Sequence, residues 1–153
     1  MISTKGRYAL RVMIDLAEHI YPADQTGTGT QPAYTAGGEA GPVYIPLKDI
    51  AERQEISKKY LEIIVKDLVN GGLVRGISGK HGGYTLCRRP EEYPVGEIIE
   101  LMEGPLAPVA CLLGGSAECP RAGSCETLPM WTEFDRMVHD FFYSKKLSDL
   151  LGR

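Results

Sequence analysis

Three of the four cysteines in this 153-residue chain lie within one short stretch, CLLGGSAECPRAGSCETLPMW. Their spacing is C-x7-C-x5-C, and the residues between them are mostly Gly, Ser, Ala and Pro. Thiolates on a pliable backbone can converge on iron, as an iron–sulfur cluster requires. Glycines allow such a backbone to approach an inorganic core closely. The stretch therefore makes Cys111, Cys119 and Cys125 candidate metal ligands, and Gly114, Gly115 and Gly123 would let the backbone wrap closely around a bound group.

Structural zinc and thiol redox chemistry are the competing interpretations of these cysteines. Zinc ribbons carry closely spaced C-x2-C pairs, and this stretch contains none. Three convergent thiols without a metal would be prone to oxidation or cross-linking. Cys87 lies outside the motif, and we expect it to be a half-buried apolar residue that binds no metal.

The composition indicates a globular, cytoplasmic protein. Hydrophobic residues make up 43% of the chain, which is enough to build a core. The chain has no run of 18 apolar residues and no secretory signal, so we expect no membrane contact. Cysteines in a reducing compartment are more often free, redox-active or metal-bound than paired. No phosphate loop or G-x-S-x-G motif is present, so we expect no enzyme.

The net charge of −3 hides an uneven distribution. Residues 46–89 contain nine Lys/Arg and five Asp/Glu, whereas residues 90–153 contain five and eleven. A basic region beside an acidic one is typical of a nucleic-acid-binding module joined to a regulatory or oligomerisation part. Ordinary variation of surface charge is the alternative.

Residues 3–20 predict a helix, because apolar side chains recur at helical spacing and Ser3 or Thr4 can cap its start. Residues 22–43 are rich in Gly, Thr, Ala and Pro and contain almost no large aliphatic side chains. Such a stretch cannot bury enough surface to offset its ordering entropy, so we expect a flexible loop there.

Residues 46–88 are expected to form two helices separated by a tight turn, followed by a hairpin. Pro46 suits the first turn of the first helix, and Ser57 caps the second. Gly71 and Gly72 end the second helix. LVRGI and YTLCR predict two strands joined by a glycine-rich tip. This order is typical of a winged helix-turn-helix. The predicted inner face of the second helix is Leu61, Ile64, Val65 and Leu68.

The remainder predicts a helix at residues 95–102 and a long helix starting near Pro129. The long helix carries a bulky apolar stripe that a small DNA-binding domain could hardly cover. We therefore expect a second subunit to pack against it, with packing inside the same chain as the alternative. The stripe consists of Trp131, Phe134, Val138 and Phe141, extended by Met137 and Phe142.

The motifs STKGRYAL, SKKYLE, GGYTL and VGEIIELMEGPLAPVACL resemble the Rrf2 family of winged-helix transcription regulators. The resemblance covers nearly the whole chain apart from residues 22–43. It implies a mainly α fold with a small β-wing. Residues 1–90 would form the winged helix-turn-helix DNA-binding domain, with a flexible insertion at 22–43. Residues 91–153 would hold the cluster-binding loop and a long C-terminal dimerisation helix.

The resemblance also implies contacts with a double-stranded DNA operator. The helix after Ser57 would enter the major groove, where Glu62 matches a base-reading glutamate and can accept a hydrogen bond from cytosine N4. A surface pair with Lys66 is the alternative role for Glu62. Ser78 stands where the family often has arginine, a charge that Lys80 or Arg75 could replace. The expected DNA-binding residues are Lys5, Arg7, Tyr8, Ser57, Lys58, Lys59, Tyr60, Glu62, Lys80 and His81.

Cluster-binding members of the family hold an iron–sulfur cluster with three cysteines of this loop. Leu128 occupies the position of their histidine ligand and cannot coordinate iron. Tyr8 occupies the position of an aspartate that another branch contributes from the partner subunit. Glu126 and Glu133 are alternative oxygen donors. The cluster type stays open, with 2Fe–2S favoured over 4Fe–4S.

The resemblance therefore implies a homodimeric transcription regulator that acts as a repressor. An iron–sulfur cluster would control its binding to the operator, and its targets would be cluster-biogenesis genes. The alternative is a repressor of cysteine and sulfur metabolism that uses a thiol or a regulatory protein partner in place of a cluster. An enzyme or electron-transfer protein is a third class, but no substrate-binding motif accompanies the cysteines.

Overall fold

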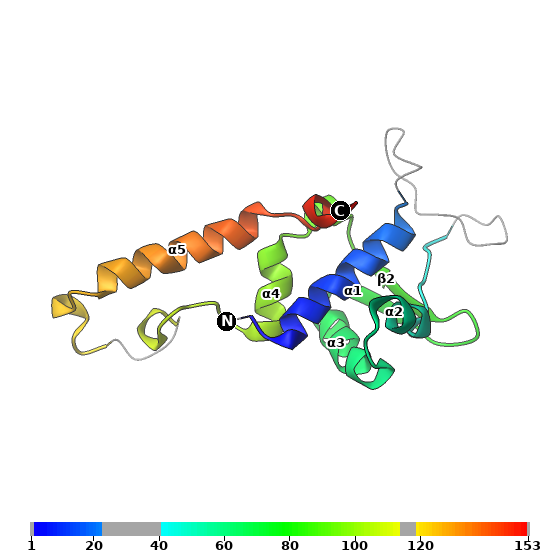
Figure 1. The fold of residues 1–153 in the computed structure, drawn as a ribbon, viewed down its shortest axis with the longest axis horizontal. Helices are drawn as coiled ribbons and strands as arrows, with labels where there is room; N and C mark the ends of the chain where they lie inside the picture. Colours follow the sequence, from blue (N-terminus) through cyan, green and yellow to red (C-terminus); the bar gives the residue numbers. More distant parts are fainter. Residues whose placement is uncertain (1, 23–40, 114–118, 153) are drawn as a thin grey trace.

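The computed structural model describes residues 2–22, 41–113 and 119–152. The loop expected at 22–43 falls almost entirely on residues 23–40, and Gly114 and Gly115 fall on 114–118. Both ranges lie outside the described residues. The predicted class, mainly helical with a small antiparallel hairpin, is confirmed (Figure 1). The helices and strands are α1 (Thr4–Ile20), α2 (Leu47–Gln54), α3 (Lys58–Asn70), β1 (Val74–Ile77), β2 (Gly83–Leu86), α4 (Val95–Glu103) and α5 (Leu128–Ser144).

Helix α1 forms the centre of the body and packs against α2, α3, α4 and β2. Ser3 caps it as predicted, because its Oγ accepts a 3.2 Å hydrogen bond from the N–H of Gly6. The predicted apolar face is buried, so burial of this face holds the helix in place. The buried apolar residues of α1 are Ala9, Val12, Met13, Leu16, Ala17 and Ile20.

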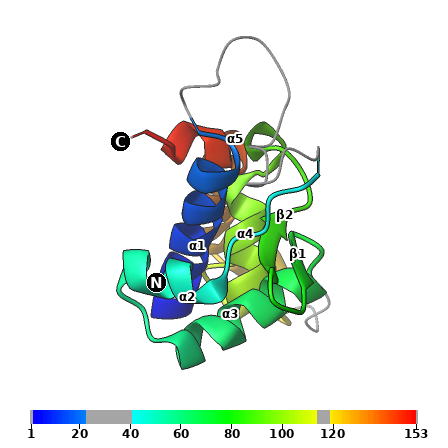
Figure 2. The same cartoon turned by 90° about the vertical axis from the view of Figure 1, so that its right-hand side faces the viewer.

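Helices α2 and α3 form the helix-turn-helix seen at the lower end of the body in Figure 2. Glu55 turns the chain with a left-handed φ of 52°, and Ile56 is buried beneath the turn. Ser57 caps α3 by accepting a 3.3 Å bond from the N–H of Tyr60. The four predicted inner residues of α3 are all buried. Gly72, with φ of +72°, ends the helix because few other residues adopt this conformation.

Strands β1 and β2 pair antiparallel, with Val74 opposite Leu86 and Ile77 opposite Gly83. The chain before α2 adds a bridge that the sequence did not predict. Ile45 and Tyr84 exchange two backbone hydrogen bonds of 2.8 Å. A Cβ at Gly83 would collide with the carbonyl of Ile45, so this close approach requires glycine.

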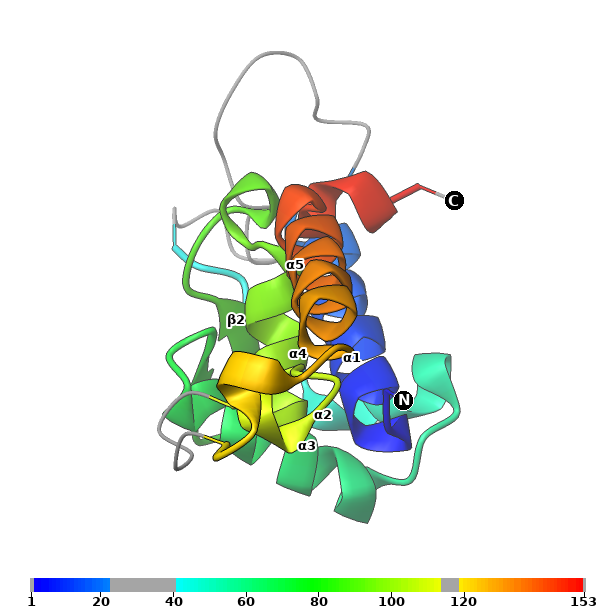
Figure 3. The same ribbon diagram turned by 90° about the vertical axis from the view of Figure 1, so that its left-hand side faces the viewer.

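Helix α4 completes the core, and Ile98 and Met102 are buried in the same cluster as α1. The chain after α5 returns to the start of α4, where Val95 N–H donates to the Lys145 carbonyl at 2.8 Å. Leu147 is fully buried in the same core. Helix α5 projects away from the body, as Figure 1 shows, and Figure 3 views it nearly end-on; it has no fully buried residue.

Candidate functional site

The outward face of α3 carries the residues predicted to enter a DNA groove. Ser57, Lys58, Lys59 and Glu62 are exposed, whereas Tyr60 is half-buried. Within the described part of the chain, no ion pair joins Glu62 to Lys66. The Glu62 carboxylate is therefore free to accept a hydrogen bond from outside the protein.

Tyr8 of α1 and Tyr60 of α3 lie together although they are far apart in the sequence. Their rings meet edge to face with centroids 5.8 Å apart, and Arg11 lies 5.3 Å from the Tyr8 ring centroid. Aromatic pairs of this geometry favour a fixed relative position of their elements. The structure thus places the predicted contact residues of α1 next to those of α3.

Lys5 and Arg7 occupy the first turn of α1, as expected. The Lys5 ammonium lies 2.5 Å from Oδ2 of Asp67 on α3, so this ion pair partly neutralises a predicted phosphate contact. Arg7 is exposed, and its guanidinium donates to Oγ1 of Thr4 at 3.1 Å. Arg7 is therefore the more accessible cation of the two.

Lys80 and His81 are exposed at the tip of the β1–β2 hairpin. The tip is closed by a 3.0 Å bond from Gly82 N–H to the Gly79 carbonyl. Between the hairpin and α3 lies a hollow of about 320 Å³, to which α3 contributes Glu62 and Lys66. The hairpin contributes Gly76, Ile77, Ser78 and Tyr84 to this hollow, whereas Lys80 and His81 lie outside it.

The three cysteines of the motif occupy the segment that joins α4 to α5. Cys111 is exposed on a short 3-10 helix, η3 (Ala110–Leu112), whereas Cys119 and Cys125 are half-buried. Among the described residues, no three Cys, His, Asp or Glu side chains form a metal-holding group. The structure thus keeps these thiols on one segment without gathering them at one point.

The surroundings of Cys125 favour its thiolate form. Its Sγ lies 3.4 Å from the hydroxyl of Thr127. This hydrogen bond lowers the pKa of Cys125 below its ordinary value. Iron–sulfur clusters are bound by thiolates. Three thiols on one segment, one of them with a lowered pKa, therefore provide suitable ligand atoms for such a cluster.

A hollow of about 660 Å³ adjoins Cys125. Leu128 and Glu133, at the start of α5, line it together with Cys125, whereas Cys111 and Cys119 do not. The structure therefore brings one predicted thiol ligand and one candidate oxygen donor to the same cavity. Tyr8 instead packs against Tyr60, and Glu126 is exposed.

The expected half-burial of Cys87 is wrong. This residue follows β2 directly and is exposed. It lines a separate polar hollow of about 610 Å³ with Tyr21 and Arg88, among others. The chain leaves the hairpin at this point, so no neighbouring element covers the thiol.

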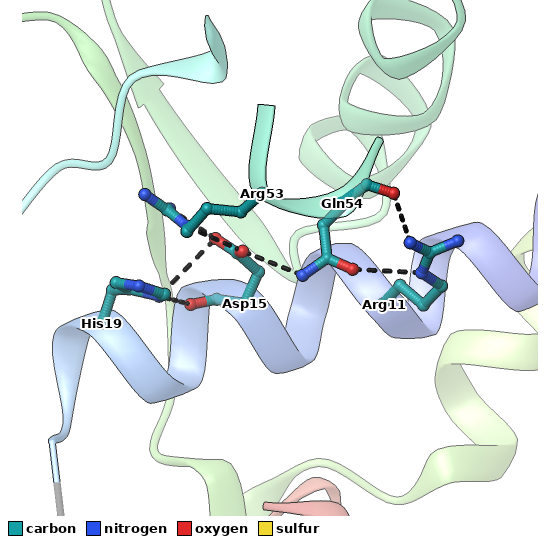
Figure 4. Close-up of polar contacts among 5 residues, drawn as sticks. All are labelled: Arg11, Asp15, His19, Arg53 and Gln54. Carbon is teal, nitrogen blue, oxygen red and sulfur yellow. Dashed lines mark hydrogen bonds and ion pairs between the residues drawn. The ribbon is translucent and has the colours of Figure 1, made fainter. Parts of the chain in front are cut away.

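A buried carboxylate, Asp15, was not recognised from the sequence. It lies on the apolar face of α1 and is 1% exposed. Figure 4 shows it facing Arg53 and Gln54 at the end of α2. Arg53 donates two bonds to it, of 2.6 and 3.0 Å, and Gln54 donates a third of 3.0 Å. An acid amid apolar helix positions was the available signal, because a buried charge requires partners.

The same network extends along α1 (Figure 4). Arg11 donates to the side-chain and backbone oxygens of Gln54, and His19 Nδ1 donates to the Asp15 carbonyl at 2.7 Å. These contacts fix the end of α2, and therefore the turn that leads into α3, against α1.

None of the helices in the described ranges has the length and apolarity needed to cross a bilayer.

Comparison with known proteins gives one consistent result. Residues 38–153 match the Rrf2 family, described as "Iron-dependent Transcriptional regulator". The chain is 33% identical over 150 residues to protein rrf2 of Nitratidesulfovibrio vulgaris, covering 98% of this chain and 86% of that protein. It is 41% identical over 111 residues to the HTH-type transcriptional regulator CymR of Bacillus subtilis, covering 72% and 66%.

Among solved structures, IscR of T. potens superposes with a TM-score of 0.65 at 31% identity, covering 98% of this chain and 85% of that one. These relatives regulate transcription and are not enzymes, which confirms the expectation for this chain. The matched region includes the helix-turn-helix, the wing, the cysteine segment and α5. The chain therefore belongs to the Rrf2 family of DNA-binding transcription regulators.

Proposed function

We propose that this protein is a homodimeric repressor that binds a palindromic operator and responds to an iron–sulfur cluster held by Cys111, Cys119 and Cys125. The observation that carries the proposal is the location of these thiols. All three occupy the one segment between α4, which is part of the core, and α5, which projects from it. A ligand in that segment can alter how the two parts are set relative to each other.

Helix α3 enters the major groove in this proposal, and the β1–β2 hairpin lies beside it as the wing. The unpaired carboxylate of Glu62 reads a base, and the exposed lysines at the start of α3 contact phosphates. Arg7, Tyr8 and the wing tip add backbone contacts. The complete set comprises Lys5, Arg7, Tyr8, Ser57, Lys58, Lys59, Tyr60, Glu62, Lys80 and His81.

The dimer forms through α5. Its most exposed apolar side chains recur at intervals of four, three and four residues, which is the spacing of a coiled-coil seam. Charged residues flank this row, so a partner helix would cover an apolar seam with a polar rim. The seam residues and their exposed fractions are Met130 (53%), Phe134 (48%), Met137 (61%) and Phe141 (58%).

When bound, an iron–sulfur cluster supplies a centre that oxidants or iron limitation can remove and that cluster assembly can restore. Cys111, Cys119 and Cys125 would hold the cluster, and its loss would release their thiolates. The end of α4 and the start of α5 would then be set differently in the two states. The 2Fe–2S form is favoured, and control of cluster-biogenesis genes accords with the iron-dependent description of the family.

A thiol- or partner-controlled repressor of sulfur metabolism is the second candidate. It is supported by the 41% identity to CymR and by the exposed thiols of Cys87 and Cys111. In that case the cysteines would act without iron, and a regulatory protein could supply the signal.

Oxygen-free purification separates the two candidates. Iron and sulfide content, with absorption and Mössbauer spectra, are measured for the wild type, a Cys111→Ser/Cys119→Ser/Cys125→Ser variant and a Cys87→Ser control. The proposal predicts a coloured wild type and control, and a triple variant without iron. A colourless, iron-free wild type would support the second candidate.

Operator binding tests the regulatory step. Fluorescence anisotropy at one fixed salt concentration compares loaded and cluster-free protein, because phosphate contacts make affinity depend strongly on salt. We expect the two affinities to differ by about 5- to 150-fold, the usual range of allosteric coupling. Equal affinities would remove the sensing role and leave the DNA-binding role intact.

A further inference from the structure

We infer that Glu103 is a positioning residue that links the cysteine segment to the DNA-reading helix through the N-terminus of α1. This inference rests on the proposed function and specifies how the state of the cysteine segment reaches α3. It starts from the position of Glu103, which is the last residue of α4.

One carboxylate oxygen of Glu103 holds the start of α1. Oε1 accepts a 3.0 Å hydrogen bond from the backbone N–H of Ser3 and a 2.6 Å bond from its hydroxyl. The same hydroxyl accepts the capping bond from Gly6 N–H. Ser3 therefore connects the carboxylate directly to the first turn of α1.

Electrostatics favour this contact. The first turn of α1 contains no acidic residue of its own. A helix N-terminus carries a partial positive charge that a nearby carboxylate stabilises, and hydrogen bonds to an ionised acceptor are stronger than neutral ones. Gly6 is buried, and a Cβ at this position would collide with Oε1 of Glu103. The absence of a side chain at Gly6 thus permits the approach.

The first turn of α1 also contacts α3. Lys5 lies two residues after Ser3, and its ammonium forms the 2.5 Å ion pair with Asp67 of α3. On the following turn, Tyr8 packs against Tyr60 near the start of α3. A shift of the α1 N-terminus would therefore act on both halves of α3, the helix proposed to enter the major groove.

On the other side of Glu103, the chain turns directly toward the cysteines. Gly104 has a φ of +80°, and its N–H donates to the Glu100 carbonyl at 2.8 Å. Cys111 follows seven residues later. A conformational change of the cysteine segment therefore acts first on the end of α4, where Glu103 is the side chain that holds α1.

The test compares the wild type with Glu103→Ala, with Glu103→Gln and with Glu91→Gln. Glu103→Gln keeps an oxygen that can accept both Ser3 bonds and should retain most of the coupling. Glu91→Gln removes one charge from an exposed position outside this contact. For each protein, iron content, thermal midpoint and operator affinity in the loaded and cluster-free states are measured.

We expect Glu103→Ala to load iron normally but to reduce the ratio of loaded to cluster-free operator affinity by about threefold or more, a substantial part of a typical coupling. Amide hydrogen exchange at residues 4–7 should differ between the two states in the wild type and should become alike in this variant. A merely structural role would change the thermal midpoint and leave the ratio intact.

Different outcomes would overturn the proposed function and the role of Glu103. A wild type with equal affinity in both states would overturn the proposed function and this inference with it. A wild-type ratio that persists unchanged in Glu103→Ala, with normal iron content, would overturn only the inference about Glu103.

Discussion

The phenol of Tyr93 donates a 2.7 Å hydrogen bond to the backbone carbonyl of Leu73, at the base of the β1–β2 hairpin. The same oxygen accepts bonds from the N–H groups of Cys87 at 2.9 Å and Arg88 at 2.8 Å. The side chain is fully buried, and burial raises the pKa of its phenol. One hydroxyl thus satisfies three backbone groups where the wing joins the body.

Replacing this tyrosine with phenylalanine should destabilise the fold. Tyr93→Phe keeps the ring but removes the hydroxyl that bonds Arg88 N–H, and it leaves Cys87 N–H and the Leu73 carbonyl with only their mutual 3.3 Å bond, so we expect a loss of roughly 1–3 kcal/mol in the free energy of unfolding. Urea denaturation followed by circular dichroism measures the change. Tyr84→Phe is the matched control, because that half-buried ring lies within β2 itself. Equal stabilities of the two variants would contradict the role of Tyr93.

The buried carboxylate of Asp15 supports the position of α2. Asp15→Asn removes the charge that Arg53 and Gln54 contact. Because the Arg53 side chain is 33% exposed, solvent screens the pair, and we expect a loss of about 1–3 kcal/mol, below the cost of breaking a fully buried pair. Operator affinity should fall as well, since α2 sets the turn into α3. Glu18→Gln, an exposed change on the same helix, should affect neither quantity.

Tyr143 should make stability depend on alkaline pH. Its hydroxyl donates a 2.6 Å bond to Glu100, and this bond raises the pKa of Tyr143 to about 12 from an ordinary value of 10.0. The folded state therefore keeps a proton that the unfolded state loses near pH 10. The stabilisation is complete below pH 10 and is lost as the pH rises toward 12.

The difference in unfolding free energy between wild type and Tyr143→Phe, measured at pH 8, 10, 11 and 12, should shrink steadily over the last three values. A difference that stays constant from pH 8 to pH 12 would show that the hydroxyl does not titrate with folding.

The apolar seam of α5 should control the oligomeric state. Phe134→Glu combined with Met137→Glu places two charges in the proposed interface, and we expect the dimer dissociation constant to rise by about 100-fold or more, equivalent to about 2.8 kcal/mol. Sedimentation velocity measures the change. Thr132→Glu introduces a charge on the opposite side of α5 and should leave the dimer intact. A wild type that sediments as a monomer at high concentration would refute the interface.

Two substitutions on α3 should affect DNA binding differently. Glu62→Ala should weaken discrimination at one base pair by about 1–3 kcal/mol, because the carboxylate is proposed to read a base edge. Lys59→Ala should weaken all sequences alike and lower the salt slope by about one, as loss of a phosphate contact does. Competition binding with single-base operator variants separates the two effects.

The sequence predicted the elements whose causes are local. Ser3 and Ser57 cap α1 and α3, and Gly72 ends α3, because caps and left-handed glycines act within a few residues. The inner face of α3 follows from helical spacing alone. The prediction of the α5 stripe included Phe134, Met137 and Phe141, yet the most exposed row also contains Met130, whereas the predicted Trp131 and Val138 are half-buried.

Contacts between distant positions were not predictable in this way. Asp15 meets Arg53 across 38 residues, and Tyr93 meets Leu73 across 20. Their partners depend on how the helices pack, which no local pattern encodes. Cys87 was misjudged for the same reason, since its exposure depends on where the chain runs after β2.

The return of the chain from α5 to α4 has a consequence for operator architecture. Val95 bonds to Lys145, Leu147 bonds to Tyr93, and Leu147 is buried in the core. The C-terminal end of α5 is therefore attached by hydrogen bonds and burial to the same body that carries α3. In the proposed dimer, the angle between α5 and that body sets the number of base pairs between the operator half-sites.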